Sequence, residues 1–148
     1  MKITERTKFV YIITSNNALE VRFIQDIAHC ALFLTFNKGV KNEDQVVISD
    51  IPKENLVNIL NFFEGFEVIT SSGIYDYIKD VDCDNLFVIS SCHGSMYGID
   101  AKQTIRPHHI TEAIKQNSHL TNCVALFGQC YAGIFNHLDT SSQGKKIV

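Results

Sequence analysis

Apolar residues along the chain fall into short continuous runs separated by stretches with three- and four-residue spacing. Four of the runs are rich in β-branched and aromatic residues, are bounded by polar or turn-forming residues, and have the length of buried strands. They are residues 7–14, 45–49, 86–90 and 123–127. The pattern therefore predicts four buried strands with other elements between them.

Three of the intervening stretches have the spacing of amphipathic helices. The first begins near Ala18 and ends at Gly39, because glycine readily adopts the left-handed conformation that closes a helix. Pro52 opens a second helix that we expect to reach Gly65, and Pro107 opens a third. Each helix lies between two predicted strands.

The remaining segments give weaker patterns. In residues 66–84 we expect a short extended piece and a short helix around Tyr75 to Ile78, and Gly133 to Leu138 predicts a helical turn. Lys145 to Val148 has the composition of the opening of another strand.

Strands that alternate with amphipathic helices predict an α/β fold with a mostly parallel sheet. Helices should cover both faces, in three layers, as in a doubly wound sheet. The 148 residues are enough for one core, and no linker or repeat divides them, so we expect a single domain over residues 1–148.

The overall composition is that of an ordinary globular protein, with 45% hydrophobic residues and a net charge of −3. Acidic and basic residues are mixed and no basic stripe is present, which argues against a nucleic-acid partner. The first residues lack the apolar stretch of a signal peptide, and no apolar tract approaches the length of a membrane span. We therefore expect a soluble cytoplasmic protein that does not bind membranes.

Five cysteines occur at irregular spacing, without a C-x-x-C pair. An odd number in this arrangement argues against a disulfide framework and against a zinc ribbon. Free thiols in a reducing compartment agree better with the pattern, and a free thiol can act as a nucleophile.

Reactive side chains follow two of the predicted strands directly. The third strand leads into Cys92, His93 and Gly94, and the fourth leads into Gln129 and Cys130. In open parallel sheets, catalytic groups gather at the carboxyl ends of the strands, so neighbouring strands would bring His93 and Cys130 together. The thiol would then be the nucleophile and the imidazole its general base.

An attack on an amide also creates an oxyanion, which needs hydrogen-bond donors fixed in advance. The backbone N–H groups of Gly94 and Cys130 are the natural pair, since glycine lets the backbone approach a substrate closely. We also expect Gly133 to permit the tight turn that lifts the thiol above the sheet edge.

Other roles for the cysteines and histidines must be weighed. Cys30, Cys83 and Cys123 are best interpreted as small buried hydrophobic residues. Cys92 and Cys130, with the His108–His109 doublet, are an alternative set of zinc ligands, although adjacent residues on an extended chain point in opposite directions. We favour no metal and no cofactor.

The same two segments resemble the legumain-like members of the caspase/haemoglobinase superfamily of cysteine peptidases. The family pattern is a hydrophobic strand into His-Gly, a helical crossover, and a hydrophobic strand into a cysteine followed by small residues. Here the two segments are residues 86–95 (LFVISSCHGS) and 124–133 (VALFGQCYAG). Residues 22–31 and 39–50 are similar to the first helix and second strand of the family.

The resemblance implies a cysteine endopeptidase that works through a thioacyl intermediate. Cys130 and His93 would be its dyad, with the N–H groups of Gly94 and Cys130 as the oxyanion hole. It also implies that Arg22 lines the pocket for the substrate residue before the cut bond, with a surface arginine on an amphipathic helix as the equal alternative. Gln129 is the second candidate substrate-binding residue. The partner would be a protein or peptide substrate.

The chain departs from the family pattern in two respects. The acidic residue that usually precedes His-Gly is replaced by Cys92, so substrate preference does not transfer. The family continues for two further strands, so the resemblance implies that the last strands are missing and that a second chain or regulatory protein completes the fold. A non-catalytic interaction module is therefore the alternative function. A flavodoxin-like nucleotide-binding domain is disfavoured because no glycine-rich loop follows the first strand.

Overall fold

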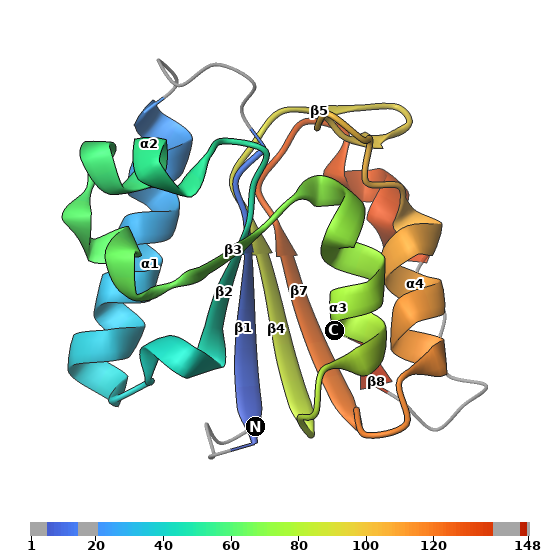
Figure 1. Ribbon diagram of the computed structural model, residues 1–148. Helices are drawn as coiled ribbons and strands as arrows, with labels where there is room; N and C mark the ends of the chain where they lie inside the picture. Colours follow the sequence, from blue (N-terminus) through green and yellow to red (C-terminus); the bar gives the residue numbers. More distant parts are fainter. Residues whose placement is uncertain (1–5, 15–20, 138–145, 148) are drawn as a thin grey trace.

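The computed structural model describes residues 6–14, 21–137 and 146–147, and its central feature is a six-stranded sheet in the order β3-β2-β1-β4-β7-β8 (Figure 1). All of its strand pairs are parallel. The strands are β1 (Thr7–Ile12), β2 (Gln45–Ile48), β3 (Glu67–Ile69), β4 (Asn85–Ser90), β7 (Asn122–Phe127) and β8 (Lys146–Ile147). The four predicted strands, the extended piece before residue 84 and the strand near the end of the chain are all confirmed.

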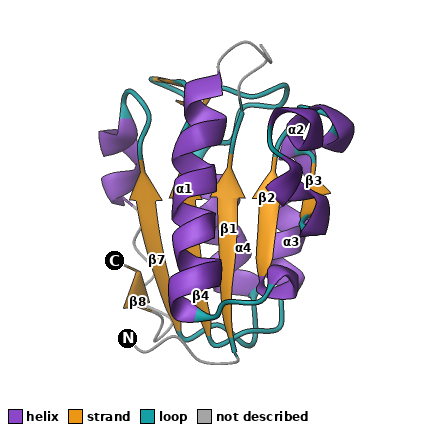
Figure 2. Cartoon of the chain, turned by 90° about the vertical axis from the view of Figure 1, so that its left-hand side faces the viewer, coloured by secondary structure: helices purple, strands orange, loops and turns teal. Residues whose placement is uncertain are grey.

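Helices cover both faces of this sheet, which makes the predicted three-layer α/β/α fold. α1 (Val21–Lys38) and α2 (Lys53–Ile59) lie on one face, and α3 (Ile74–Asp80) and α4 (Pro107–Gln116) lie on the other (Figures 1 and 2). Single turns of 3₁₀ helix complete the connections: η1 (Asn42–Asp44), η2 (Asn61–Gly65), η3 (Ser71–Gly73) and η4 (Ala132–His137).

Side-chain alternation along β1 divides the interior into two cores. Val10 and Ile12 pack toward α3 and α4, whereas Phe9 and Tyr11 pack toward α1 and α2. All four are buried because a central parallel strand is covered on both faces. The Tyr11 hydroxyl donates a hydrogen bond to Oε1 of Gln45 at 2.7 Å, which satisfies a polar group that would otherwise be costly to bury.

The predicted helix from Pro52 to Gly65 is wrong in its extent. α2 ends at Ile59, Leu60 is extended with φ −149°, and η2 continues the chain in a different direction. This break lets Phe63 and Phe66 both reach the core beneath α1, so the burial of two aromatic rings outweighs continuation of the helix. The described part of the first helix ends as predicted, with Gly39 at φ +70°.

A small hairpin beside the sheet was not expected from the sequence. β5 (Gly94–Ser95) and β6 (Gly98–Ile99) pair in an antiparallel way, and Figure 1 shows β5 above the end of the sheet where the strands terminate. α3 is also longer than the expected short helix, whereas the predicted turn after Gly133 corresponds to η4 within the described residues.

Within residues 6–14 and 21–137, no helix combines the length and the apolar character that crossing a membrane would require.

Candidate active site

His93 and Cys130 leave neighbouring strands at the same edge of the sheet. β4 and β7 pair in parallel register, with Ser90 opposite Phe127 at their carboxyl ends. Three residues beyond each of these positions the chain reaches His93 and Cys130, and both residues are exposed. The two strands are therefore neighbours, which is the condition under which His93 and Cys130 were expected to emerge at one edge.

Hydrogen bonds join the two segments just after the strands end. The Gly128 N–H donates to the carbonyl oxygen of Ser90 at 3.1 Å, and the Ser90 hydroxyl donates to Oε1 of Gln129 at 2.6 Å. These bonds hold the cysteine-bearing loop against the histidine-bearing loop. The strand register is thus carried into the candidate site.

Gly94 and Cys130 lie in direct backbone proximity. A β-carbon placed on Gly94 would overlap the carbonyl oxygen of Cys130 and would lie 2.5 Å from Cγ of Gln129. Only glycine fits this space without movement of a neighbour. The two residues predicted to supply oxyanion donors therefore adjoin each other, and the donor role of their N–H groups stays a prediction.

The first turn of α1 packs against His93. The Phe23 ring makes an edge contact with the imidazole, with 4.9 Å between ring centroids and an interplanar angle of 84°. One turn later Asp26 accepts a hydrogen bond from the Ser91 hydroxyl at 2.8 Å. An aromatic contact of this kind restricts the orientation of the imidazole ring. Phe23 is a site residue that the sequence did not identify, and its position beside Arg22 was the available signal.

The backbone of His93 is fixed from a second direction by the segment after the hairpin. The Asp100 N–H donates to the His93 carbonyl oxygen at 3.0 Å. Ile99 and Ile105 exchange two backbone hydrogen bonds of 3.0 and 3.1 Å, and both side chains are buried in the core beneath α4. The histidine loop is therefore anchored to the core.

The cysteines separate into buried thiols and one exposed thiol. Burial raises the pKa of Cys83 and of Cys92 to about 11 and the pKa of Cys123 to about 12. The predicted burial of Cys83 and Cys123 is confirmed, whereas Cys30 is half-buried and burial raises its pKa as well. Among the five free cysteines, only Cys130 is exposed.

The two predicted substrate-binding residues differ in exposure: Arg22 is exposed and Gln129 is buried. Arg22 is exposed, and its guanidinium carbon lies 4.6 Å above the centre of the Phe23 ring. Gln129 is only 8% exposed, its Oε1 is bonded to Ser90, and its Nε2 has no hydrogen-bond partner among the described residues. This placement favours Gln129 as a brace between the loops, while substrate contact by either residue stays a prediction.

Tyr131, next to Cys130, has an unusual backbone conformation with φ +58°. A bulky residue in the left-handed region is uncommon and strained, and no sequence pattern indicates it. Gly133 was expected to make the tight turn here, but it has no positive φ and open space around a potential side chain. The turn that exposes the thiol is thus made at Tyr131.

The histidine doublet has a structural role that bears on the zinc alternative. His109 Nδ1 accepts a hydrogen bond from the Arg106 N–H at 3.2 Å, which closes the first turn of α4. Burial, aided by His108 and Arg106, lowers the pKa of His109, consistent with a neutral acceptor. Within the described residues, no three His, Cys, Asp or Glu side chains are grouped as metal ligands.

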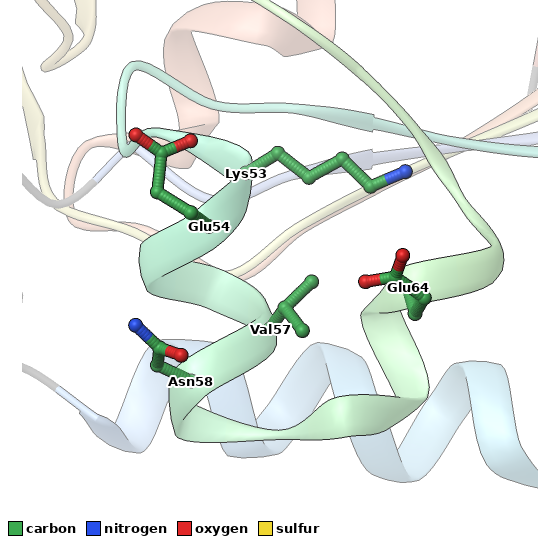
Figure 3. A pocket seen from close by; sticks show the side chains of 5 residues that line it. All are labelled: Lys53, Glu54, Val57, Asn58 and Glu64. Atoms are coloured by element: carbon green, nitrogen blue, oxygen red, sulfur yellow. The ribbon is translucent and has the colours of Figure 1, made fainter.

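A depression between α2 and η2 is separate from the candidate residues. Four polar side chains border it, with those of α2 on one side and Glu64 of η2 on the other (Figure 3). Its lining residues are Lys53, Glu54, Val57, Asn58 and Glu64. It is open and of mixed charge, and it contains neither a nucleophile nor an imidazole.

Compared with models of known protein families, with curated proteins and with solved structures, the chain matches none of them.

Proposed function

We propose that the protein is a cysteine endopeptidase of the caspase/legumain-like superfamily, with Cys130 as nucleophile and His93 as general base and acid. The observation that carries the proposal is the convergence of two loops from the adjacent parallel strands β4 and β7. It puts the one exposed thiol of the five cysteines and an exposed imidazole at one edge of the sheet. The order of the motifs along the chain and the three-layer fold agree with that superfamily.

The chemistry follows from the two side chains. His93 takes the thiol proton, and the sulfur of Cys130 bonds to the carbonyl carbon of the substrate amide. The oxyanion accepts hydrogen bonds from the N–H groups of Gly94 and Cys130. As it collapses, the C–N bond breaks and His93 gives its proton to the departing amine.

The second half of the reaction releases the acyl group. A water molecule gives a proton to His93 while its oxygen attacks the thioester carbon. The C–S bond then breaks, and the sulfur recovers a proton from His93. The products are a carboxylic acid and the free thiol, so the cycle needs no cofactor.

Two features of the surroundings support this assignment. The ring of Phe23 and the hydrogen bond from the Asp100 N–H hold the His93 side chain and backbone, respectively, which is the support a general base needs. The raised pKa values of Cys83, Cys92 and Cys123 keep those thiols protonated near neutral pH. A peptidase with five free thiols also belongs in a reducing compartment, so we propose a cytoplasmic location and a protein or peptide substrate.

Labelling with a peptidyl electrophile tests the proposal directly. A peptidyl acyloxymethyl ketone should modify Cys130, as located by mass spectrometry of proteolytic fragments. His93→Ala should lower the labelling rate by at least about a hundredfold, because it removes the general base. Cys30→Ala is the matched control, since it removes a thiol that is less accessible, and it should leave the labelling unchanged.

Labelling that persisted in Cys130→Ala, or that spread equally over the five cysteines, would contradict the dyad. A folded protein in which Cys130 reacts no faster than a cysteine in a short unstructured peptide would instead support a non-catalytic interaction module. Circular dichroism and the unfolding midpoint of each variant show whether a lost reaction comes from a lost fold.

A further inference from the structure

The two loops that carry the candidate dyad also carry a concentration of exposed apolar side chains. Six large hydrophobic residues are exposed in the described part of the chain, and four of them lie within four positions of His93 or Cys130: Leu126 at the end of β7, and three in the loops themselves. Met96 and Tyr97, at the tip of the β5–β6 hairpin, are 65% and 64% exposed, and Tyr131 is 65% exposed. Clustered exposed apolar residues of this kind mark binding surfaces.

The loops that carry the three side chains touch each other at their backbones. Gly94, at the start of the hairpin, adjoins the carbonyl oxygen of Cys130, and Tyr131 follows Cys130 directly. Met96 and Tyr97 thus follow this backbone contact by two and three residues, and all three side chains belong to segments that meet at Cys130. A peptide with its scissile bond at Cys130 would have to pass between or beside them.

Charge is absent from both loops. Residues 91–99 and 127–135 contain no Asp, Glu, Lys or Arg, in a chain in which 20% of the residues are charged. Recognition of a charged side chain by these loops would require an opposite charge or a set of polar donors. Their composition instead favours an uncharged, apolar side chain.

The hairpin is built to hold its tip in place. Gly94 pairs with Ile99 and Ser95 pairs with Gly98, and the Tyr97 N–H donates to the Ser95 hydroxyl at 3.3 Å. Below the tip, Ile99 is bonded to Ile105 and is fully buried. A rigid support lets exposed side chains bind a partner with little loss of conformational entropy.

The backbone conformation of Tyr131 supports a binding role independently of its exposure. Its positive φ would be accommodated with less strain by glycine or asparagine, and its ring is left exposed to solvent. The backbone of Tyr131 is strained, and its ring is exposed next to the nucleophile in sequence. Strained residues cluster at functional sites, so this ring is well suited to contact substrate.

We propose that Met96, Tyr97 and Tyr131 form an apolar rim that selects peptides with an aromatic or aliphatic side chain within two residues of the scissile bond. This inference rests on the proposed peptidase function. Met96 and Tyr97 would contact that side chain from the hairpin, and Tyr131 would contact it from the cysteine loop.

Matched peptide substrates test the rim. A mixed peptide pool first locates a cut site by mass spectrometry, and internally quenched peptides then differ only in Phe, Leu, Ser or Asp at each position flanking it. The wild-type protein should show at least about a tenfold higher kcat/KM for Phe or Leu at one of these positions than for Ser or Asp. The Met96→Ser/Tyr97→Ser double variant and Tyr131→Asn should reduce that preference to about threefold or less.

Phe36→Ser is the control, because Phe36 on α1 is 76% exposed and belongs to neither loop. It should leave the preference unchanged. Asparagine is chosen at position 131 because it tolerates the left-handed conformation, so the variant removes the ring and keeps the backbone.

The outcomes separate this inference from the proposed function. Cleavage of all peptides at similar rates would overturn the apolar rim and leave the peptidase intact. If no peptide is cleaved, fluorescence anisotropy with the same peptides, dye-labelled, replaces turnover. Tighter binding of the Phe and Leu peptides that is lost in the rim variants supports the rim without catalysis, whereas equal or undetectable binding overturns it.

Discussion

Beyond the carboxyl ends of β2 and β3, Asp50 and Ser71 are joined to neighbouring segments by hydrogen bonds, whereas His93 and Cys130, beyond β4 and β7, are exposed to solvent. Asp50, after β2, accepts bonds from the Ser71 N–H at 3.0 Å, the Ser71 hydroxyl at 2.8 Å and the Lys102 N–H at 2.8 Å. After β4 and β7, His93 and Cys130 are exposed. One sheet edge thus contains a structural half and a candidate reactive half.

Residues 100–103 connect the structural half to the reactive half by hydrogen bonds to both. Asp50 and Ser71 bind the backbone N–H groups of Lys102 and Gln103, while Asp100, two residues earlier, donates to the His93 carbonyl. Hydrogen bonds in the structural half therefore help to position the backbone of the His93 loop.

Loss of Asp50 should damage the fold far more than loss of the nucleophile. Asp50→Ala removes a charged acceptor and leaves several donors unpaired, so the free energy of unfolding should fall by about 2–3 kcal/mol. Cys130→Ala truncates an exposed side chain and should change it by less than about 0.5 kcal/mol. Urea denaturation followed by circular dichroism measures both variants.

Asp50→Asn serves as the control in that series, because it keeps an acceptor oxygen without the charge and should lose less stability than Asp50→Ala. Equal losses for Asp50→Ala and Cys130→Ala would show that the two halves do not differ in the way described.

Gly94 and Gly133 differ in the space that surrounds a potential β-carbon, because Gly94, unlike Gly133, lies where the two loops approach each other closely. A methyl group on Gly94 would overlap the backbone of Cys130, so Gly94→Ala should lower the free energy of unfolding by about 2 kcal/mol and separate the loops. A β-carbon on Gly133 meets nothing within 4 Å, so Gly133→Ala should be neutral within about 0.5 kcal/mol. Similar losses for the two variants would argue against the contact.

The buried thiols predict a loss of stability in alkali. Burial raises the pKa of Cys92 to about 11, so between pH 9 and 11 the folded chain keeps a proton that the unfolded chain has lost. The unfolded state then binds fewer protons, and the free energy of unfolding falls as pH rises, by at most about 1.4 kcal/mol per pH unit for one thiol. Cys92→Ala should show a shallower fall over the same interval, measured by urea denaturation at each pH. An identical slope would mean that ionisation of Cys92 does not oppose folding.

Relief of the backbone strain at Tyr131 should produce the smallest change in the free energy of unfolding, and this change should be an increase. Tyr131→Gly should raise the free energy of unfolding by about 1 kcal/mol or less, since glycine adopts the left-handed conformation without steric cost. Tyr131→Ala keeps the β-carbon and the strain, so it should give no such gain. Equal stabilities of the two variants would place the origin of the effect in the ring instead of the backbone.

Much of the fold was predictable because it depends on local patterns. The four runs of apolar residues became β1, β2, β4 and β7, and the helix-opening positions of Pro52 and Pro107 were correct. Parallel geometry then implied that His93 and Cys130 would emerge at one edge. Alternation of strands and helices indicates the strand direction, whereas the pairing of β4 with β7 is a finding of the structure.

The features that were missed depend on tertiary context. The two-residue strands β5 and β6 are too short for any periodicity, and α2 ends early because Phe63 and Phe66 turn inward. Nothing in the sequence marks Tyr131 as a residue with positive φ. The burial of Gln129 likewise follows from its bond to Ser90, 39 residues away along the chain.

Trapping of the acyl-enzyme shows whether Cys130 and His93 act together as a catalytic dyad. A reactive peptide ester is mixed with the protein, the reaction is quenched in acid within its first turnovers, and the intact mass and the modified residue are determined. We expect a mass increase equal to the acyl part of the substrate, located on Cys130, absent in Cys130→Ala and strongly diminished in His93→Ala. An adduct on another cysteine, or steady turnover by Cys130→Ala, would contradict it.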